Sequence, residues 1–226
     1  MQPYFFPYAG YFQLFAAANR FIFYDDVNYI RGGWINRNRF LMNGEAKFFL
    51  VPIADQSSFR KIKDTQIAEG PWREKMLKGF EFSYRRAKSY EPVRDLIEGV
   101  LATKSHLVGD FAKASVVAVA EYLGIETQVV GTSQGFENEN LNGEERILDI
   151  CDKAGAREYI NLPGGRELYS AENFAARNIR LRFLRPALSQ YPQGKNAFMP
   201  GLSIVDILMN NSQEDARRLI AMTEVE

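Results

Sequence analysis

The chain has 226 residues, of which 46% are hydrophobic and 25% charged, ordinary values for a globular protein with a buried core. Lysine plus arginine and aspartate plus glutamate number 28 each, so the net charge is zero, which argues against nucleic-acid binding as the main function. No stretch approaches about 18 consecutive apolar residues, so no membrane span is expected. A single cysteine, Cys151, excludes an internal disulfide and fits a reducing cytoplasm.

The first fifteen residues, MQPYFFPYAGYFQLF, hold seven aromatic residues and two prolines and carry no charged side chain. They lack the basic start, the unbroken apolar run and the small-residue cleavage site of a secretory signal. Pro3 and Pro7 would break a helix, so residues 1–6 are predicted to form a short strand. Gly10 permits a tight turn, after which residues 11–19 are predicted to form a helix.

A buried strand is predicted over residues 21–24 (FIFY), ending before two consecutive aspartates. Residues 39–53 are predicted to form a hairpin, because Asn43 and Gly44 are the pair that type I′ turns prefer and strand-forming residues flank them.

The section 70–124 is predicted to be mostly helical, with Gly124 ending its last helix. Three- and four-residue spacing predicts that one face of that helix carries Leu107, Phe111, Ala114, Ala118 and Tyr122.

Strands and helices then alternate, which is typical of a parallel sheet covered by helices. We therefore expect an α/β fold with a Rossmann-like, mostly parallel sheet of at least five strands and helices on both faces. One domain should span residues 1–226, with a β-hairpin insertion at 30–60. The later predicted strands are 127–131, 158–162 and 179–184, and the later predicted helices are 142–155, 167–178, 203–211 and 212–222.

Polar residues, glycines and charges gather after the predicted strands. In open α/β sheets ligands bind beyond the carboxyl ends of the strands, so this edge is predicted to be the functional cleft. The residues expected to bind a ligand there are Gln2, Tyr4, Tyr8, Gly10, Tyr11, Arg31, Trp34, Asn36, Arg37, Asn38, Asn161, Gly164, Gly165, Tyr191 and Gln193.

The segment RGGWINRN, residues 31–38, is the strongest local constellation. Its two arginines could hold phosphate or carboxylate, its asparagines could bind sugar hydroxyls or a base edge, and Trp34 offers a flat face for stacking. Gly10 would let a ligand approach the backbone at the start of the first helix, where phosphate is favoured. The alternative is a structural lead-in to the hairpin, in which Arg37 pairs with Asp25 or Asp26.

Asp25 and Asp26 are the candidate catalytic residues, as a general base or as magnesium ligands beside a phosphate. The alternative is that they cap the strand end and form an ion pair.

Asp206 lies three residues after Ser203, a spacing that favours a capping box. Cys151 lies on an apolar helix face and is predicted to be core.

The lone histidine, His106, is expected at the surface. One histidine excludes a multi-histidine metal site. The residues identify no cofactor.

The chain resembles the WbqC-like family from Met1 to about Asn211, through the motifs MQPYFFPYAGYFQL, YDDVNYIRGGWINRNR, YINLPGGRELY, YPQ and FMPGLSIVDILMNN. It departs from the family pattern conservatively, as at Ala9, where a larger aliphatic residue is usual. The resemblance implies a bacterial protein associated with genes for O-antigen and other surface polysaccharides. It also implies amino-sugar modification, including aminoacyl transfer. A second resemblance links YAGY, residues 8–11, to the two-histidine, one-glycine motif of nucleotidylyltransferases, with tyrosines in the histidine positions.

The leading hypothesis is a cytoplasmic enzyme of surface-polysaccharide biosynthesis that acts on a nucleotide-linked sugar and transfers an acyl or aminoacyl group to a sugar amine. In it, Arg31 and Arg37 hold phosphate, Trp34 stacks on a base or sugar, and Asp25 or Asp26 accepts a proton. The alternative is a non-catalytic nucleotide-sugar binding module that serves a biosynthetic partner. Pairing of the chain with a second copy is left open.

Overall fold

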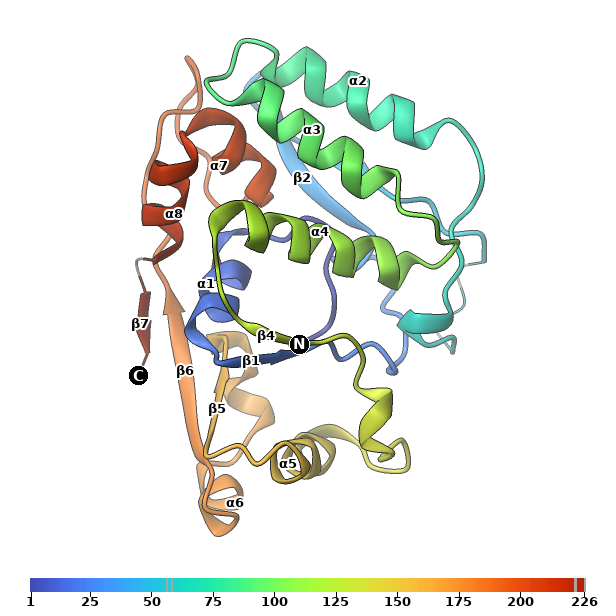
Figure 1. Ribbon diagram of the computed structural model, residues 1–226, viewed down its shortest axis with the longest axis vertical. Coiled ribbons are helices and arrows are strands. Elements are labelled where there is room, and N and C mark those ends of the chain that lie inside the picture. The colour runs from blue at the N-terminus through green and yellow to red at the C-terminus, as the bar shows by residue number, and fades with distance from the viewer. Residues whose placement is uncertain (56, 58, 222, 226) are drawn as a thin grey trace.

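The computed structural model describes residues 1–55, 57, 59–221 and 223–225 (Figure 1). The helices are α1 (Ala9–Ala17), α2 (Trp72–Tyr84), α3 (Tyr90–Leu101), α4 (Val108–Leu123), α5 (Gly143–Lys153), α6 (Ala171–Ala176), α7 (Ile204–Asn210) and α8 (Gln213–Ala221). The strands are β1 (Arg20–Ile22), β2 (Arg37–Met42), β3 (Glu45–Leu50), β4 (Gln128–Val130), β5 (Glu158–Asn161), β6 (Arg180–Pro186) and β7 (Thr223–Val225). Short 3₁₀ helices are η1 (Ile62–Asp64), η2 (Gln134–Phe136) and η3 (Pro163–Leu168).

The expected α/β class is confirmed, but the sheet is not the one predicted. The described strands form three small sheets: parallel β1–β4, the antiparallel hairpin β2–β3, and β5–β6–β7, in which β5 and β6 are parallel and β7 is antiparallel. The prediction of one parallel sheet of at least five strands is therefore wrong for these residues, and a Rossmann-like fold is not confirmed. β1 pairs with β4 on one edge. Its other edge is bonded to Met1 and not to β5, so the parallel sheet does not continue there.

Residues 1–6 do not form the predicted strand. Met1 alone pairs with the backbone along β1, and the chain then turns at Phe6, whose φ of 42° is unusual for a non-glycine residue. Three side chains fix this turn. The Phe6 N–H donates to Ser115 Oγ at 2.9 Å, and its carbonyl oxygen accepts from Asn38 Nδ2 at 2.9 Å and from Ser203 Oγ at 2.7 Å. The turn delivers the chain into α1, where the helix was expected.

The hairpin forms as predicted. Asn43 and Gly44 connect β2 to β3 with φ of 53° and 80°, the positive values that a type I′ turn requires at both central positions.

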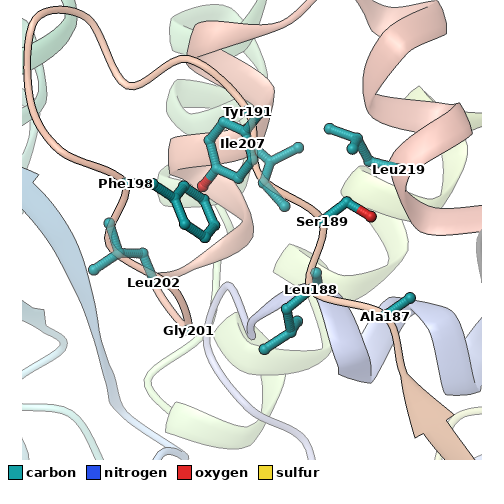
Figure 2. Close-up of a pocket in the computed structure, with 10 residues that line it drawn as sticks. Ala187, Leu188, Ser189, Tyr191, Phe198, Gly201, Leu202, Ile207 and Leu219 are labelled. Atoms are coloured by element: carbon teal, nitrogen blue, oxygen red, sulfur yellow. The ribbon is translucent and has the colours of Figure 1, made fainter.

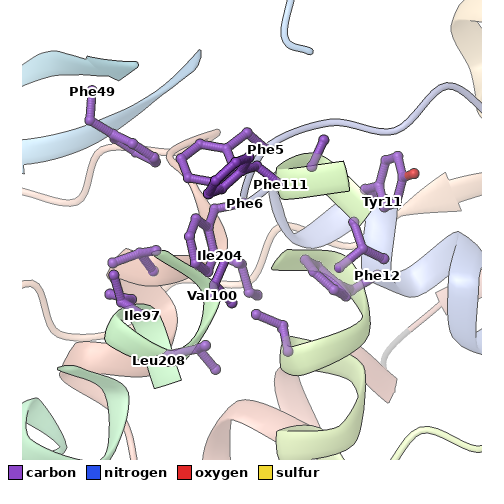
Figure 3. Close-up of a cluster of buried hydrophobic side chains, with 14 of the residues drawn as sticks. Phe5, Phe6, Tyr11, Phe12, Phe49, Ile97, Val100, Phe111, Ile204 and Leu208 are labelled. Carbon is purple, nitrogen blue, oxygen red and sulfur yellow. The ribbon is translucent and has the colours of Figure 1, made fainter. Parts of the chain in front are cut away.

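The helical section forms α2, α3 and α4, which pack beside one another over the hairpin (Figure 1). Gly124 ends α4 in the left-handed conformation, as predicted. The buried face of α4, however, contains Val108, Phe111, Ser115 and Val119, whereas the predicted face is buried only at Phe111. This face packs against the aromatic side chains of residues 5–15 (Figure 3).

A second, smaller apolar cluster joins α5 and α6 to β5 and β6, at the end of the molecule away from α2 and α3 (Figure 1). Cys151 lies in this cluster, which confirms its prediction as a core residue. Burial raises the pKa of its thiol to about 11, so the thiol is neutral and unreactive. Among the described residues, no helix is both long and apolar enough to cross a membrane.

Candidate binding site

Asp25 lies just beyond β1, where the chain meets the end of β4. Its Oδ2 is 3.1 Å from Lys113 Nζ, while Oδ1 accepts hydrogen bonds from Thr132 Oγ1 at 2.7 Å and from the Ser133 N–H at 3.3 Å. The segments that follow two neighbouring parallel strands therefore do meet, as the strand-end rule suggests. Both carboxylate oxygens of Asp25 are occupied by the protein itself.

Asp26 is held still more tightly. One carboxylate oxygen accepts from the Ser133 hydroxyl, and the other pairs with the Arg146 guanidinium from α5. Arg146 also donates to Asn138 Oδ1 at 3.0 Å and lies 5.0 Å from the centre of the Tyr24 ring. This arrangement matches the strand-end ion-pair alternative, but the cation is not the predicted Arg37.

These contacts decide whether Asp25 or Asp26 can act as a general base or as a metal ligand. A general base needs a lone pair directed at its substrate, and the oxygens of Asp25 and Asp26 are directed at Lys113, Arg146 and hydroxyl donors. Within the described part of the chain, no three histidine, cysteine, aspartate or glutamate side chains are grouped to hold a metal ion. The geometry therefore gives the two aspartates a positioning role, joining β1 to α4 and α5.

Four side chains on the outer face of the hairpin form what we call the cation–aromatic strip: Arg37, Phe48, Trp34 and Arg39. The Trp34 and Phe48 rings stack with centroids 6.3 Å apart, Arg37 lies 4.6 Å from the Phe48 centroid, and Arg39 lies 5.6 Å from the Trp34 centroid. Trp34 is 39% exposed and Phe48 51% exposed. Each ring thus has one guanidinium beside it and stays partly exposed to solvent.

The strip contains two residues that the sequence interpretation missed, Phe48 and Arg39. Alternation along the hairpin could have found them, since the side chains of β2 positions two apart share a face with those of their partners on β3. In the observed register Arg39 is paired with Phe48, and Arg37 with Leu50. The strip therefore follows directly from the hairpin that was predicted.

The guanidinium groups near the strip have no acidic partners in the described residues. Arg37 donates to the carbonyl oxygens of Gly33, at 3.1 Å, and Gly32, and Arg39 donates to Gly201 O at 3.3 Å. Arg31 is exposed and pairs with no described carboxylate. Burial raises the pKa of the Tyr29 hydroxyl while nearby Arg37 and Arg31 oppose that rise, which locates both cations beside Tyr29. Positive charge is therefore concentrated here without internal compensation.

The two asparagines of the same segment point away from solvent. Asn36 Nδ2 donates to Val51 O at 2.8 Å, and its Oδ1 accepts from the Tyr29 hydroxyl at 2.8 Å. Asn38 is buried and supports the Phe6 carbonyl. Within RGGWINRN, the arginines and the tryptophan face outward and the amides hold the scaffold together.

The first-helix turn is packed internally. The Tyr11 side chain is fully buried, and its hydroxyl donates to Gln2 O at 3.0 Å, so it belongs to the core. The half-buried Tyr8 ring folds over Gly10, where an added Cβ would lie 2.6 Å from Tyr8 Cε2. Burial raises the pKa values of Tyr4 and Tyr8. The space beside Gly10 is thus filled by the Tyr8 ring, where a ligand was expected to approach the backbone.

The residues predicted after β5 also contact one another. Asn161 Oδ1 accepts from the Leu162 N–H at 2.8 Å, and Nδ2 donates to the Tyr159 hydroxyl at 3.3 Å. A Cβ on Gly165 would lie 2.7 Å from Asn161 Nδ2, so a side chain there would displace the Asn161 amide, whereas Gly164 borders open space. These residues lie near β6 and α6, apart from the strip in sequence and in sheet.

Tyr191 and Gln193 meet at Asp206, in the first turn of α7. Asp206 Oδ2 accepts from the Tyr191 hydroxyl and from Gln193 Nε2, each at 2.7 Å, and Oδ1 accepts from the Tyr84 hydroxyl at 2.7 Å. Burial, and then the carboxylate, raise the pKa values of both phenols. The carboxylate therefore does not complete the predicted capping box, although Ser203 does cap the Val205 N–H.

A cavity of about 20 Å³ lies beside this network, between the start of α1 and the segment 187–202 (Figure 2). Figure 2 shows Tyr191, Phe198 and Leu202 on one side and Ala187 and Leu188 on the other. A cavity of that size holds about one water molecule. This cavity is therefore too small for a larger ligand. A second, open hollow of about 540 Å³ is lined by Arg157, Glu158, Ala175, Asn178, Ile179 and Arg180. The strip is the exposed surface that combines arginines with aromatic rings.

The fold and the strip together define a mixed α/β protein with an exposed arginine–aromatic surface. The chain belongs to the WbqC-like protein family, whose model matches residues 2–218. It is also 29% identical, over 212 residues, to the uncharacterized protein Rv1507c of Mycobacterium tuberculosis, covering 92% of this chain and 90% of that one. No solved structure matches the chain.

Proposed function

We propose that this protein binds a nucleotide-linked sugar at the cation–aromatic strip and acts, in the cytoplasm, in the biosynthesis of a bacterial surface polysaccharide. The observation that carries the proposal is the set of arginines around exposed Trp34, none of which has a carboxylate partner in the described residues. The polysaccharide setting comes from the family resemblance.

The chemistry of the strip fits such a ligand in two parts. Guanidinium groups bind diphosphate oxygens through paired, charge-assisted hydrogen bonds, and Arg37 and Arg39 lie on one face of β2, two residues apart. The exposed parts of the Trp34 and Phe48 rings offer apolar area for a base or a sugar ring. Arg37 is already oriented by the Gly32 and Gly33 carbonyls, which lowers the entropy lost on binding.

A second candidate is the transfer of an acyl or aminoacyl group to the amine of the bound sugar. The family resemblance supports it. The left-handed backbone of Phe6 does not, because that residue is buried and its backbone is held by Ser115, Asn38 and Ser203. The internal contacts of Asp25 and Asp26 argue against either one as the base. Binding is therefore the function that the geometry supports best.

Thermal unfolding of the pure protein with uridine, guanosine and thymidine diphosphate sugars tests the proposal. A ligand present at about 100 times its Kd should add roughly 2.7 kcal/mol to the free energy of unfolding. The free sugars serve as controls and should add much less, because they lack the diphosphate. No stabilisation by any nucleotide sugar would contradict the proposal.

A further inference from the structure

The outer edge of β3 is unpaired. β3 pairs only with β2 among the described strands, and the two-residue turn makes Met42 and Glu45 a hydrogen-bonded pair. Hydrogen-bonded pairs then recur at every second position, so the N–H and C=O groups of Ala46, Phe48 and Leu50 point away from β2. No described residue bonds to these groups.

The edge carries limited protection: its two charged side chains, Glu45 and Lys47, pair with each other at 2.5 Å, and Pro52 lies beyond the strand. Exposed edge strands are normally blunted by charge, proline or a bulge, because they can pair with another chain. Here Phe48 is 51% exposed and Leu50 45% exposed, at two of the three positions whose backbone groups are free. The edge combines free backbone bonding groups with apolar side chains.

We propose that two copies of this chain pair through β3, antiparallel about a two-fold axis, to form a continuous four-stranded sheet. In the proposed register Phe48 is opposite Phe48 of the other copy, and Ala46 is opposite Leu50. Each outward N–H and C=O of these residues gains a partner, a small side chain faces a large one, and the rings form an aromatic pair.

The neighbouring registers are worse. Only shifts that keep the outward-pointing groups opposite one another preserve the hydrogen bonds. One such shift sets Lys47 directly opposite Lys47, which like charges disfavour. The other sets Ala46 opposite Pro52, which has no N–H to donate. The register with Phe48 on the axis is therefore the one that the sequence of β3 favours.

Charge on the strip does not oppose this pairing. The two β2 strands would be separated by three strand spacings, roughly 14 Å. The arginines of one copy would then lie beyond the Debye length of about 8 Å from those of the other. Pairing uses the edge of β3 and the Phe48 ring and leaves Trp34, Arg37 and Arg39 free for a ligand, so Phe48 is the one strip residue that both interactions use.

Light scattering coupled to size-exclusion chromatography tests the dimer with two variants at one position. Phe48→Pro removes an outward N–H without touching a bond to β2, and Phe48→Ile keeps that N–H. Proline removes two hydrogen bonds per dimer and should raise the dimer Kd about thirtyfold. Isoleucine should change it only a few-fold. A wild-type chain that is monomeric at every concentration, or a dimer equally tolerant of proline, would overturn the proposal.

Cysteine cross-linking tests the register without relying on the proline variant. Cys151 is buried and should not react in the folded protein. Phe48→Cys should give a disulfide-linked dimer, because the Cα atoms of a hydrogen-bonded pair lie about 5.5 Å apart. Glu45→Cys is the matched control, since its two copies would be about 20 Å apart. Equal cross-linking of both variants, or of Glu45→Cys alone, would overturn the register.

Discussion

Asp26 and Arg146 form an ion pair from which water is excluded, with side chains that are 0% and 5% exposed. This ion pair connects the segment that follows β1 to the second apolar cluster, because Arg146 directly precedes Ile147 and Leu148 of that cluster on α5. A carboxylate in this position contributes to the structure by orienting α5. It has no oxygen free to accept a proton from a substrate.

Removing Asp26 should therefore destabilise the fold. Asp26→Ala leaves the Arg146 guanidinium buried without a counter-charge, and the free energy of unfolding should fall by about 3–5 kcal/mol. Urea unfolding measures this loss. Asp55→Ala is the control, since its ion pair with Arg60 is exposed and should contribute about 0–1 kcal/mol. Equal effects of the two substitutions would contradict the buried-pair account.

Asn38 should prove to be a scaffold residue. Asn38→Ala removes the amide that donates to the Phe6 carbonyl and should lower the free energy of unfolding by about 1–3 kcal/mol. Affinity for a nucleotide sugar, per folded molecule, should change little. Asn140 is exposed and has no described hydrogen bond, so Asn140→Ala should be neutral. Loss of affinity without loss of stability in Asn38→Ala would contradict this assignment.

The packing of Tyr8 over Gly10 predicts that the effect of Gly10→Ala on stability depends on the Tyr8 side chain. In the wild type, Gly10→Ala places a Cβ against the Tyr8 ring and should cost roughly 1 kcal/mol. In a Tyr8→Ala background the same change should be neutral or stabilising, because alanine favours helix over glycine. Thermal unfolding of the four proteins in the double-mutant cycle measures the coupling. An equal effect in both backgrounds would show that Tyr8 does not require glycine.

Stability should depend on Cys151 at alkaline pH. Burial raises the thiol pKa from 9.0 to about 11, so the folded state keeps a proton that the unfolded state releases first. The thiol's contribution is fully present below pH 9.0 and is lost as the pH rises toward about 11. The difference in unfolding free energy between wild type and Cys151→Ala should be constant up to that window and shrink across it. A constant difference throughout would contradict the shift.

Local patterns predicted the hairpin and most of the helices because turn chemistry and helix ends depend on neighbouring residues. Asn43 and Gly44 specify a type I′ turn, and Gly124 specifies a helix end, without help from the rest of the fold. The three separate sheets could not be predicted in this way. Strand pairing depends on contacts between segments distant in the sequence, and strands as short as β1 and β4 provide few of them.

The candidate site also has features that the local sequence could predict and features that it could not. The outward direction of Arg37 and Trp34 follows from the loop and β2, so the sequence could indicate an exposed binding segment. The partners of the aspartates could not be predicted, because Lys113 and Arg146 are 88 and 120 residues away from Asp25 and Asp26. The turn at Phe6 depends on Asn38, Ser115 and Ser203, which no local pattern connects.

The strip is the central claim, and titration calorimetry of Arg37→Ala with a uridine diphosphate sugar tests it most directly. Affinity should fall about thirtyfold, the scale of one charge-assisted hydrogen bond, while the melting temperature changes little. Arg37→Lys should recover little, because lysine lacks the planar fork, and the exposed Arg86→Ala is the matched control that should bind normally. A large loss of melting temperature with unchanged affinity per folded molecule would contradict the claim.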